Sequence, residues 1–182
     1  MRTPWLSSFW SRWRLDRRGV SAVEFAIILP TFLILYLGGF EISNATATYR
    51  KLTDTTVELA NVTAQYTTMA ASDVTTVMSA SAQIMAPYAT SSLKIVLSEV
   101  TTDVNNNPTV TWSQAYNGAT ALTVGAPVAM PAGLPTASTN YILVQTTYSY
   151  VPIIGSTYVG TLPMSDQLYV LPRQSTSIPY TG

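Results

Sequence analysis

One carboxylate stands near the start of a long apolar run, where it could pair with a newly formed chain end. Residues 20–40 contain no charged side chain except Glu24. Gly19 precedes this run, and a residue without Cβ fits a peptidase cleft in an extended conformation. Cleavage between Gly19 and Val20 would make Glu24 the fifth residue, within reach of the new α-amine of its own or a neighbouring subunit. Hydrolysis by a peptidase, followed by ion pairing of Glu24, is thus one interpretation of these residues.

Glu24 also has a simpler interpretation. An ionisable side chain inside a membrane segment costs on the order of 3 kcal/mol on insertion scales. Near a helix N-terminus this cost is reduced, because the side chain reaches the interface and meets the positive end of the helix dipole. Glu24 would then be a tolerated charge without a partner, and the residues alone leave both interpretations open.

A membrane helix is the element that must position these residues. At about 1.5 Å per residue, a helix over residues 20–40 spans roughly 30 Å, the thickness of a bilayer core. Five of the nine basic residues, including Arg17 and Arg18, precede this segment, together with one acid. The positive-inside rule then predicts a cytoplasmic N-terminus and a translocated remainder. Pro30 lies within the segment and predicts a helix kink.

The spacing of these residues resembles a type IV prepilin cleavage site, in which a glycine is followed five positions later by a glutamate and then an aromatic residue, here Phe25. The fuller string resembles the TadE/TadG-like pseudopilins of tight-adherence (Tad, Flp-type) pilus systems, and comprises Arg18-Gly19, Ala22-Val23-Glu24-Phe25-Ala26 and Leu29-Pro30. The resemblance implies that an inner-membrane prepilin peptidase cuts after Gly19, and that Glu24 takes part in processing and subunit alignment. It extends with less specific phrases over most of the chain.

The resemblance implies a pseudopilin or minor pilin that takes part in pilus assembly, not an enzyme, and it implies no cofactor. The implied partners are prepilin peptidase, other Tad pseudopilins, the major pilin and the inner-membrane pilus platform. The implied location is the bacterial inner membrane, as a single-pass protein with a periplasmic C-terminal domain, or the extracellular pilus. A TadE-like role and a TadG-like role are not separated.

Other interpretations remain. The chain could be an uncleaved, single-pass envelope protein with a periplasmic binding domain. A secretory signal ending near residues 45–47 and a twin-arginine signal at Arg17-Arg18 are less consistent with the residues, because the apolar run is long and Gly-Val follows the arginines. A membrane-anchored enzyme using carboxylates would need more than Asp54 and Glu58, which are four apart on one helix face and have no third ligand or base with them.

Composition excludes several kinds of chemistry. The chain has no cysteine and no histidine, which rules out disulfides, thiol catalysis, a Ser-His-Asp triad and histidine-ligated metals. No basic patch follows residue 20, so we expect no nucleic-acid partner.

The predicted organisation is a basic leader at 1–19, a transmembrane helix at 20–40, a helical region at 41–86 and an antiparallel sheet domain at 87–182. Apolar and small residues recur at spacings of three and four from Ile42 to Ala70, and we favour packing of this stripe on the chain's own domain over a partner helix. This helix is predicted to end near Met69. A second helix, capped by Ser72 or Asp73, is predicted to run to about Ala86.

Alternating patterns predict strands at 93–101 (with one bulge), 109–115, 141–150 and 167–171, separated by a turn at 105–108 and a loop at 117–139. The residues after Arg173 are predicted to fray. A long helix followed by a small antiparallel sheet is an α+β fold.

Overall fold

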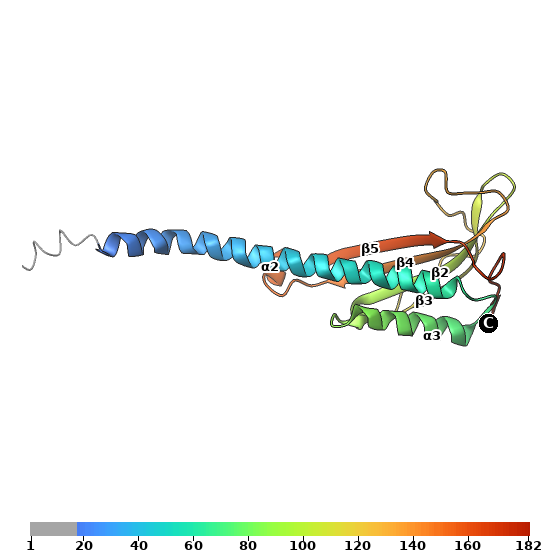
Figure 1. Ribbon diagram of the computed structural model, residues 1–182, viewed down its shortest axis with the longest axis horizontal. Helices are drawn as coiled ribbons and strands as arrows, with labels where there is room; N and C mark the ends of the chain where they lie inside the picture. Colours follow the sequence, from blue (N-terminus) through green and yellow to red (C-terminus); the bar gives the residue numbers. More distant parts are fainter. Residues whose placement is uncertain (1–17) are drawn as a thin grey trace, which may run out of the picture. The chain divides into compact units, whose positions relative to one another are not determined.

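A computed structural model describes residues 18–182, and these divide between two compact units, Met1–Ser43 and Asn44–Gly182. Helix α2 (Arg18–Thr63) supplies the described part of the first unit and opens the second (Figure 1). The first part of α2 is apolar on every side and is not buried against the rest of the described chain. The predicted leader, including Arg17, lies outside the described residues except at its end.

The second part of α2 packs on its own unit. Leu52 and Leu59 are fully buried, and so are threonines interleaved with them. Thr48, Thr55 and Thr56 each donate a hydrogen bond from Oγ1 to the backbone carbonyl four residues earlier, which satisfies the hydroxyl inside the core. The predicted stripe therefore packs within the domain despite its mixed polarity, although Ile42 and Tyr49 are exposed.

The predicted helix end near Met69 was wrong, because α2 stops at Thr63. The last turn tightens: the N–H groups of Gln65 and Tyr66 donate to carbonyls three residues earlier. The N–H of Arg173 then donates to the carbonyl of Ala64. The chain leaves the helix there and continues into strand β1 (Met69–Ala70).

Helix α3 (Ala71–Ala82) continues into a 3-10 turn, η1 (Gln83–Met85), close to the predicted end at Ala86. The cap differs from the prediction, because Ala70 is the N-cap residue. Asp73 nevertheless stabilises the helix start, since its Oδ2 accepts a hydrogen bond from the Ala70 N–H at 3.0 Å. Val74, Val77 and Met78 face the core, as predicted.

The sheet is antiparallel and has the order β3-β2-β4-β5. Its strands are β2 (Leu93–Thr102), β3 (Pro108–Tyr116), β4 (Asn140–Tyr150) and β5 (Leu162–Val170). The register of β2 against β3 shifts between Glu99 and Val100, which confirms the predicted bulge. Strand β5 begins five residues before the predicted start, and a short helix, α4 (Ser156–Val159), precedes it.

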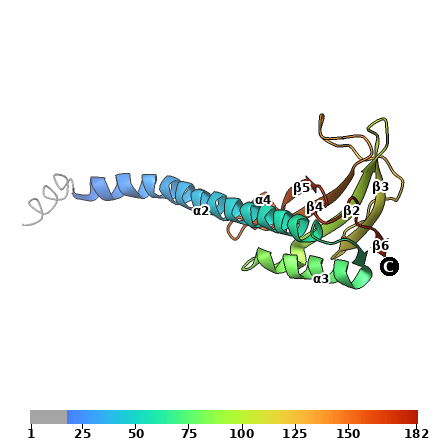
Figure 2. The ribbon, with the colours of Figure 1, turned by 45° about the vertical axis from the view of Figure 1, so that its right-hand side comes forward.

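The prediction of a frayed C-terminus was also wrong. Strand β6 (Tyr180–Thr181) pairs in parallel with β1, and Ile178 is fully buried. Figures 1 and 2 show this last segment returning to the start of α3. The tail is held because it supplies both a core side chain and a strand partner.

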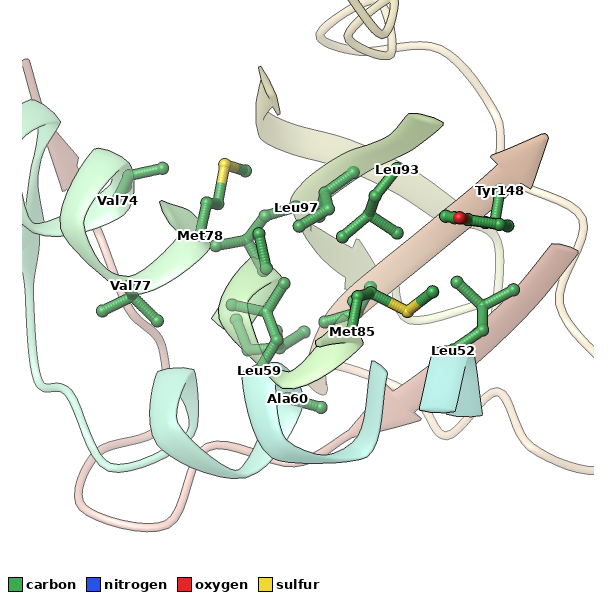
Figure 3. Close-up of a cluster of buried hydrophobic side chains, with 14 of the residues drawn as sticks. Leu52, Leu59, Ala60, Val74, Val77, Met78, Met85, Leu93, Leu97 and Tyr148 are labelled. Atoms are coloured by element: carbon green, nitrogen blue, oxygen red, sulfur yellow. The ribbon is translucent and has the colours of Figure 1, made fainter. Parts of the chain in front are cut away.

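One core joins these elements. Figure 3 shows Leu52 and Leu59 from α2, Met78 from α3, and Leu97 and Tyr148 from the sheet converging between the two helices and the strands. Burial of these side chains is the main stabilising term for such a unit. The predicted α+β fold, with a long apolar N-terminal helix and a small antiparallel sheet, is confirmed.

Candidate processing and anchoring site

The predicted scissile bond lies in the described part of α2. Gly19 and Val20 are both helical and follow Arg18, the first residue that the structure describes. A peptidase binds its substrate in an extended conformation, so this part of α2 must open before the bond can be cut.

Glu24 follows Val20 by one helical turn. Residues four apart lie on the same helix face with Cβ atoms about 5–6 Å apart. The structure thus brings Val20 and Glu24 together on one side of α2, and both are exposed. Phe25 is exposed on the adjoining face. Pro30 lies inside α2, which is helical on both sides of it.

The surface around these residues is unusually apolar for a protein in water. Between residues 20 and 40 the exposed large apolar side chains are Val20, Val23, Phe25, Ile27, Ile28, Leu29, Phe32, Leu33, Ile34, Leu35, Tyr36 and Phe40. A contiguous exposed apolar surface of this kind is typical of a membrane or protein contact. By length and composition, α2 is the one described helix that could cross a membrane, and it fits a single-pass anchor.

A comparison with protein-family models finds a match that covers this segment. Residues 19–61 match the family model of TadE-like proteins. The TadE-like match begins at the predicted scissile glycine and ends in the second unit, two residues before α2 does. It confirms the predicted TadE/TadG-like resemblance for α2 and connects the chain with Tad pilus assembly. TadE-like pilus assembly proteins are a structural family rather than an enzyme family.

The TadE-like match does not reach the sheet, to which the weaker resemblance was expected to extend. No curated protein and no solved structure matches the chain.

The described part of the chain contains no group of three or more acidic side chains that could hold a metal ion. Asp54 is exposed on α2. Glu58 is exposed too, and it borders an apolar hollow of about 240 Å³ between α2 and α3, lined by Val62, Val77 and Ile84 among others. A second hollow of about 430 Å³ lies on β4 and β5, and its walls are mostly hydroxyl and amide side chains.

No pattern in the sequence indicated a buried carboxylate at Glu99. This side chain is 1% exposed. Its Oε1 accepts a hydrogen bond from the Ile178 N–H at 2.7 Å, and its Oε2 accepts one from Trp112 Nε1 at 3.0 Å. Trp112 Nε1 also donates to the Ile178 carbonyl at 2.8 Å. Glu99 therefore ties the C-terminal tail to the sheet at the β2 bulge.

Burial raises the pKa of Glu99 above its ordinary value of 4.5, because removal from water penalises the charged form. The hydrogen bonds from Ile178 and Trp112 oppose this shift without cancelling it. The folded chain consequently binds a proton at Glu99 more readily than the unfolded chain does.

Glu99 is expected to make the free energy of unfolding depend on pH. Because its folded pKa is raised, its contribution is complete below pH 4.5 and is lost as the pH rises through the folded pKa. Glu99→Gln removes this titration, so the wild type should lose stability relative to the variant as the pH rises above 4.5. Urea unfolding of the full chain in detergent, followed by circular dichroism across this range, measures the difference.

The pKa of Asp103 is shifted in the opposite direction to that of Glu99. Hydrogen bonds from the backbone N–H and the side-chain amide of Asn107 lower its pKa below 3.8, so its contribution to stability is lost only at more acidic pH.

The Glu99→Gln experiment has one outcome that would contradict the prediction. The stability difference between wild type and Glu99→Gln would be independent of pH above 4.5 if burial did not shift the Glu99 titration.

Proposed function

We propose that the chain is a pseudopilin or minor pilin of a Tad-type pilus, made as a precursor and processed by prepilin peptidase. The observation that carries the proposal is the TadE-like match, which begins at Gly19 and covers an exposed apolar helix with Glu24 four residues after Val20. In this proposal residues 1–19 are the leader, 20–40 cross the membrane, and 41–86 and 87–182 form the periplasmic part.

The orientation rests on charge. Arg17 and Arg18 lie directly before the apolar segment, whereas the residues after it carry more acids than bases. The positive-inside rule then keeps the leader in the cytoplasm, where the peptidase can reach Gly19, and sends the sheet unit across the membrane. The partners are the peptidase, other pseudopilins, the major pilin and the inner-membrane platform.

In this proposal the Glu24 carboxylate acts after the bond between Gly19 and Val20 has been cut. The new α-amine of Val20 carries a positive charge at the positive end of the helix dipole, which leaves two like charges at one helix end. A carboxylate one turn later, on the same face, can neutralise its own or a neighbour's amine. An unpaired charge inside a bilayer is costly, so pairing between subunits would fix their register along the fibre axis.

Glu24→Ala is expected to leave membrane insertion intact, because the helix becomes more apolar, but to reduce pilus assembly by at least about tenfold, equivalent to about 1.4 kcal/mol. Pilus yield from cells, with the amount of membrane-bound protein measured in parallel, tests this. Glu24→Asp retains the charge and should recover part of the yield.

Asp54→Asn is the matched control, because Asp54 is an exposed acid on the same helix. It should assemble as the wild type does. Normal pilus yield from Glu24→Ala would show that the carboxylate has no pairing role, whereas equal losses from both variants would point to a general effect of charge on α2.

A further inference from the structure

We propose that the loop between β4 and β5, residues 151–161, is a second contact with the membrane and inserts apolar side chains at the lipid headgroup level. Four of its large apolar residues are well exposed: Val151 (56%), Ile153 (72%), Tyr158 (94%) and Val159 (60%). The loop contains no charged residue. Aliphatic side chains with a tyrosine are the residue types found at membrane–water interfaces.

The loop holds these side chains in a fixed arrangement. Pro152 is buried and fixes the start of the loop. The N–H groups of Tyr158 and Val159 donate to the carbonyl of Gly155, at 2.9 and 3.0 Å, which forms the short turn α4. Gly155 has a φ of 77°, a conformation that a residue with a side chain rarely adopts. The apolar side chains are therefore presented by a folded turn, which lowers the entropy lost on binding.

The second unit places the loop at the end where α2 enters. Thr56 of α2 and Thr146 of β4 are hydrogen-bonded through their hydroxyls at 2.6 Å. Figure 3 shows Leu52, one turn earlier in α2, below Tyr148, two residues later in β4. Strand β4 thus runs toward the beginning of the unit at Asn44.

The chain enters the second unit at this same end. Phe40, the last residue of the predicted membrane segment, precedes Asn44 by four residues in α2, which is about 6 Å along a helix. The loop therefore belongs to the end of the second unit that follows most directly, along the chain, from the predicted membrane segment. This proximity favours lipid as the occupant over a second copy of the chain, and the absence of charge favours binding that does not depend on anionic lipid or on salt.

Exposed apolar residues elsewhere do not share this setting. Val104 is 76% exposed, but it lies in the turn after β2. Because Thr101 pairs with Asn140 at the start of β4, this turn is at the opposite end of the sheet from the loop. Val104 is also a single apolar residue between Asp103 and Asn105. It serves as a matched control for the position of an exposed apolar side chain.

Depth-dependent fluorescence quenching tests the inference on the full chain. The sequence has no cysteine, so Tyr158→Cys, Val104→Cys and Tyr36→Cys each give one site for an environment-sensitive fluorophore. Each protein is reconstituted into phosphatidylcholine vesicles with and without a lipid that carries a quencher near its headgroup. The label at 158 should be quenched at least about threefold more than the label at 104, at low and high salt alike, while the label at 36 reports insertion of α2.

The inference rests on the proposed membrane anchor, and the three labels separate the two failures. Quenching at 36 but not at 158 would overturn the lipid contact and leave the anchor intact. No quenching at 36 would overturn the anchor and the loop contact with it. If the label at 158 is shielded from the lipid quencher at high protein density and is quenched no more than the label at 104 at one chain per vesicle, a second copy covers the loop and the lipid contact is refuted.

Discussion

Gly19→Leu is expected to leave the protein at its full length in cells that contain prepilin peptidase, while the wild type loses residues 1–19. Leucine adds a branched side chain at the residue whose carbonyl is attacked, and the peptidase must bind that residue in an extended conformation. The same substitution favours helix over open chain, since Gly is about 1 kcal/mol poorer than Ala or Leu inside a helix. Both effects act against cleavage.

Intact-mass measurement of protein extracted from membranes gives the length directly, with and without the peptidase. Gly38→Leu is the matched control, because a Cβ built at Gly38 meets no atom within 4 Å in the described chain and the residue is far from the cut. It should be processed normally. The proposed processing is wrong if Gly19→Leu matures fully, or if the mature wild type begins at a residue other than Val20.

Trp112→Ala is expected to destabilise the folded chain by about 3–5 kcal/mol, the usual range for removing a large buried aromatic side chain. Trp112 is nearly buried and stacks on Tyr180 with ring centroids 5.7 Å apart. Its loss also deprives the buried Glu99 carboxylate of one of its two donors. The C-terminal tail should detach before the rest of the unit unfolds, because Tyr180 and Ile178 both contact this indole.

Two measurements distinguish the overall loss of stability from the detachment of the C-terminal tail. Urea unfolding gives the total loss, and amide hydrogen exchange at Ile178 reports the tail. Trp112→Phe keeps most of the ring but no N–H, so it should cost about 1–3 kcal/mol, the range for a buried polar group left without its partner. Val104→Ala, at an exposed position, should change stability little. Unaltered exchange at Ile178 in Trp112→Ala would show that Glu99 and β1 hold the tail without the indole.

Most of the regular elements could be predicted because their signals are local. Strand β4 is a run of β-branched and aromatic residues, and the polar residue at Glu99 marks the phase slip that proves to be the bulge. The apolar helix and Gly19–Glu24 spacing identified the TadE-like segment without any tertiary information. Strand β5 was predicted too short, and it begins before Pro163, a residue that is tolerated in a strand at the sheet edge.

The remaining features depend on contacts between distant residues. Strands β1 and β6 have two residues each, too few for any periodic pattern. Tyr66 and Ala70 continue the three-four spacing of α2, yet the chain leaves the helix at Thr63 because Met69 pairs with the C-terminal segment. A charged residue in a strand is normally expected to face solvent, and only the arrival of Trp112 and Ile178 makes Glu99 an interior residue.

The attachment of Ile178 to Glu99 has a consequence for the order of synthesis and export. The two residues are 79 positions apart, and Ile178 fills a core site that no earlier residue supplies. Folding with such long-range contacts is slow, because the closing loop must be ordered before the contact forms. A chain emerging N-terminus first would keep its core incomplete until its last segment is released. In the export proposed above, the nascent domain would therefore stay unfolded enough to be translocated, and would close only after its last segment has crossed.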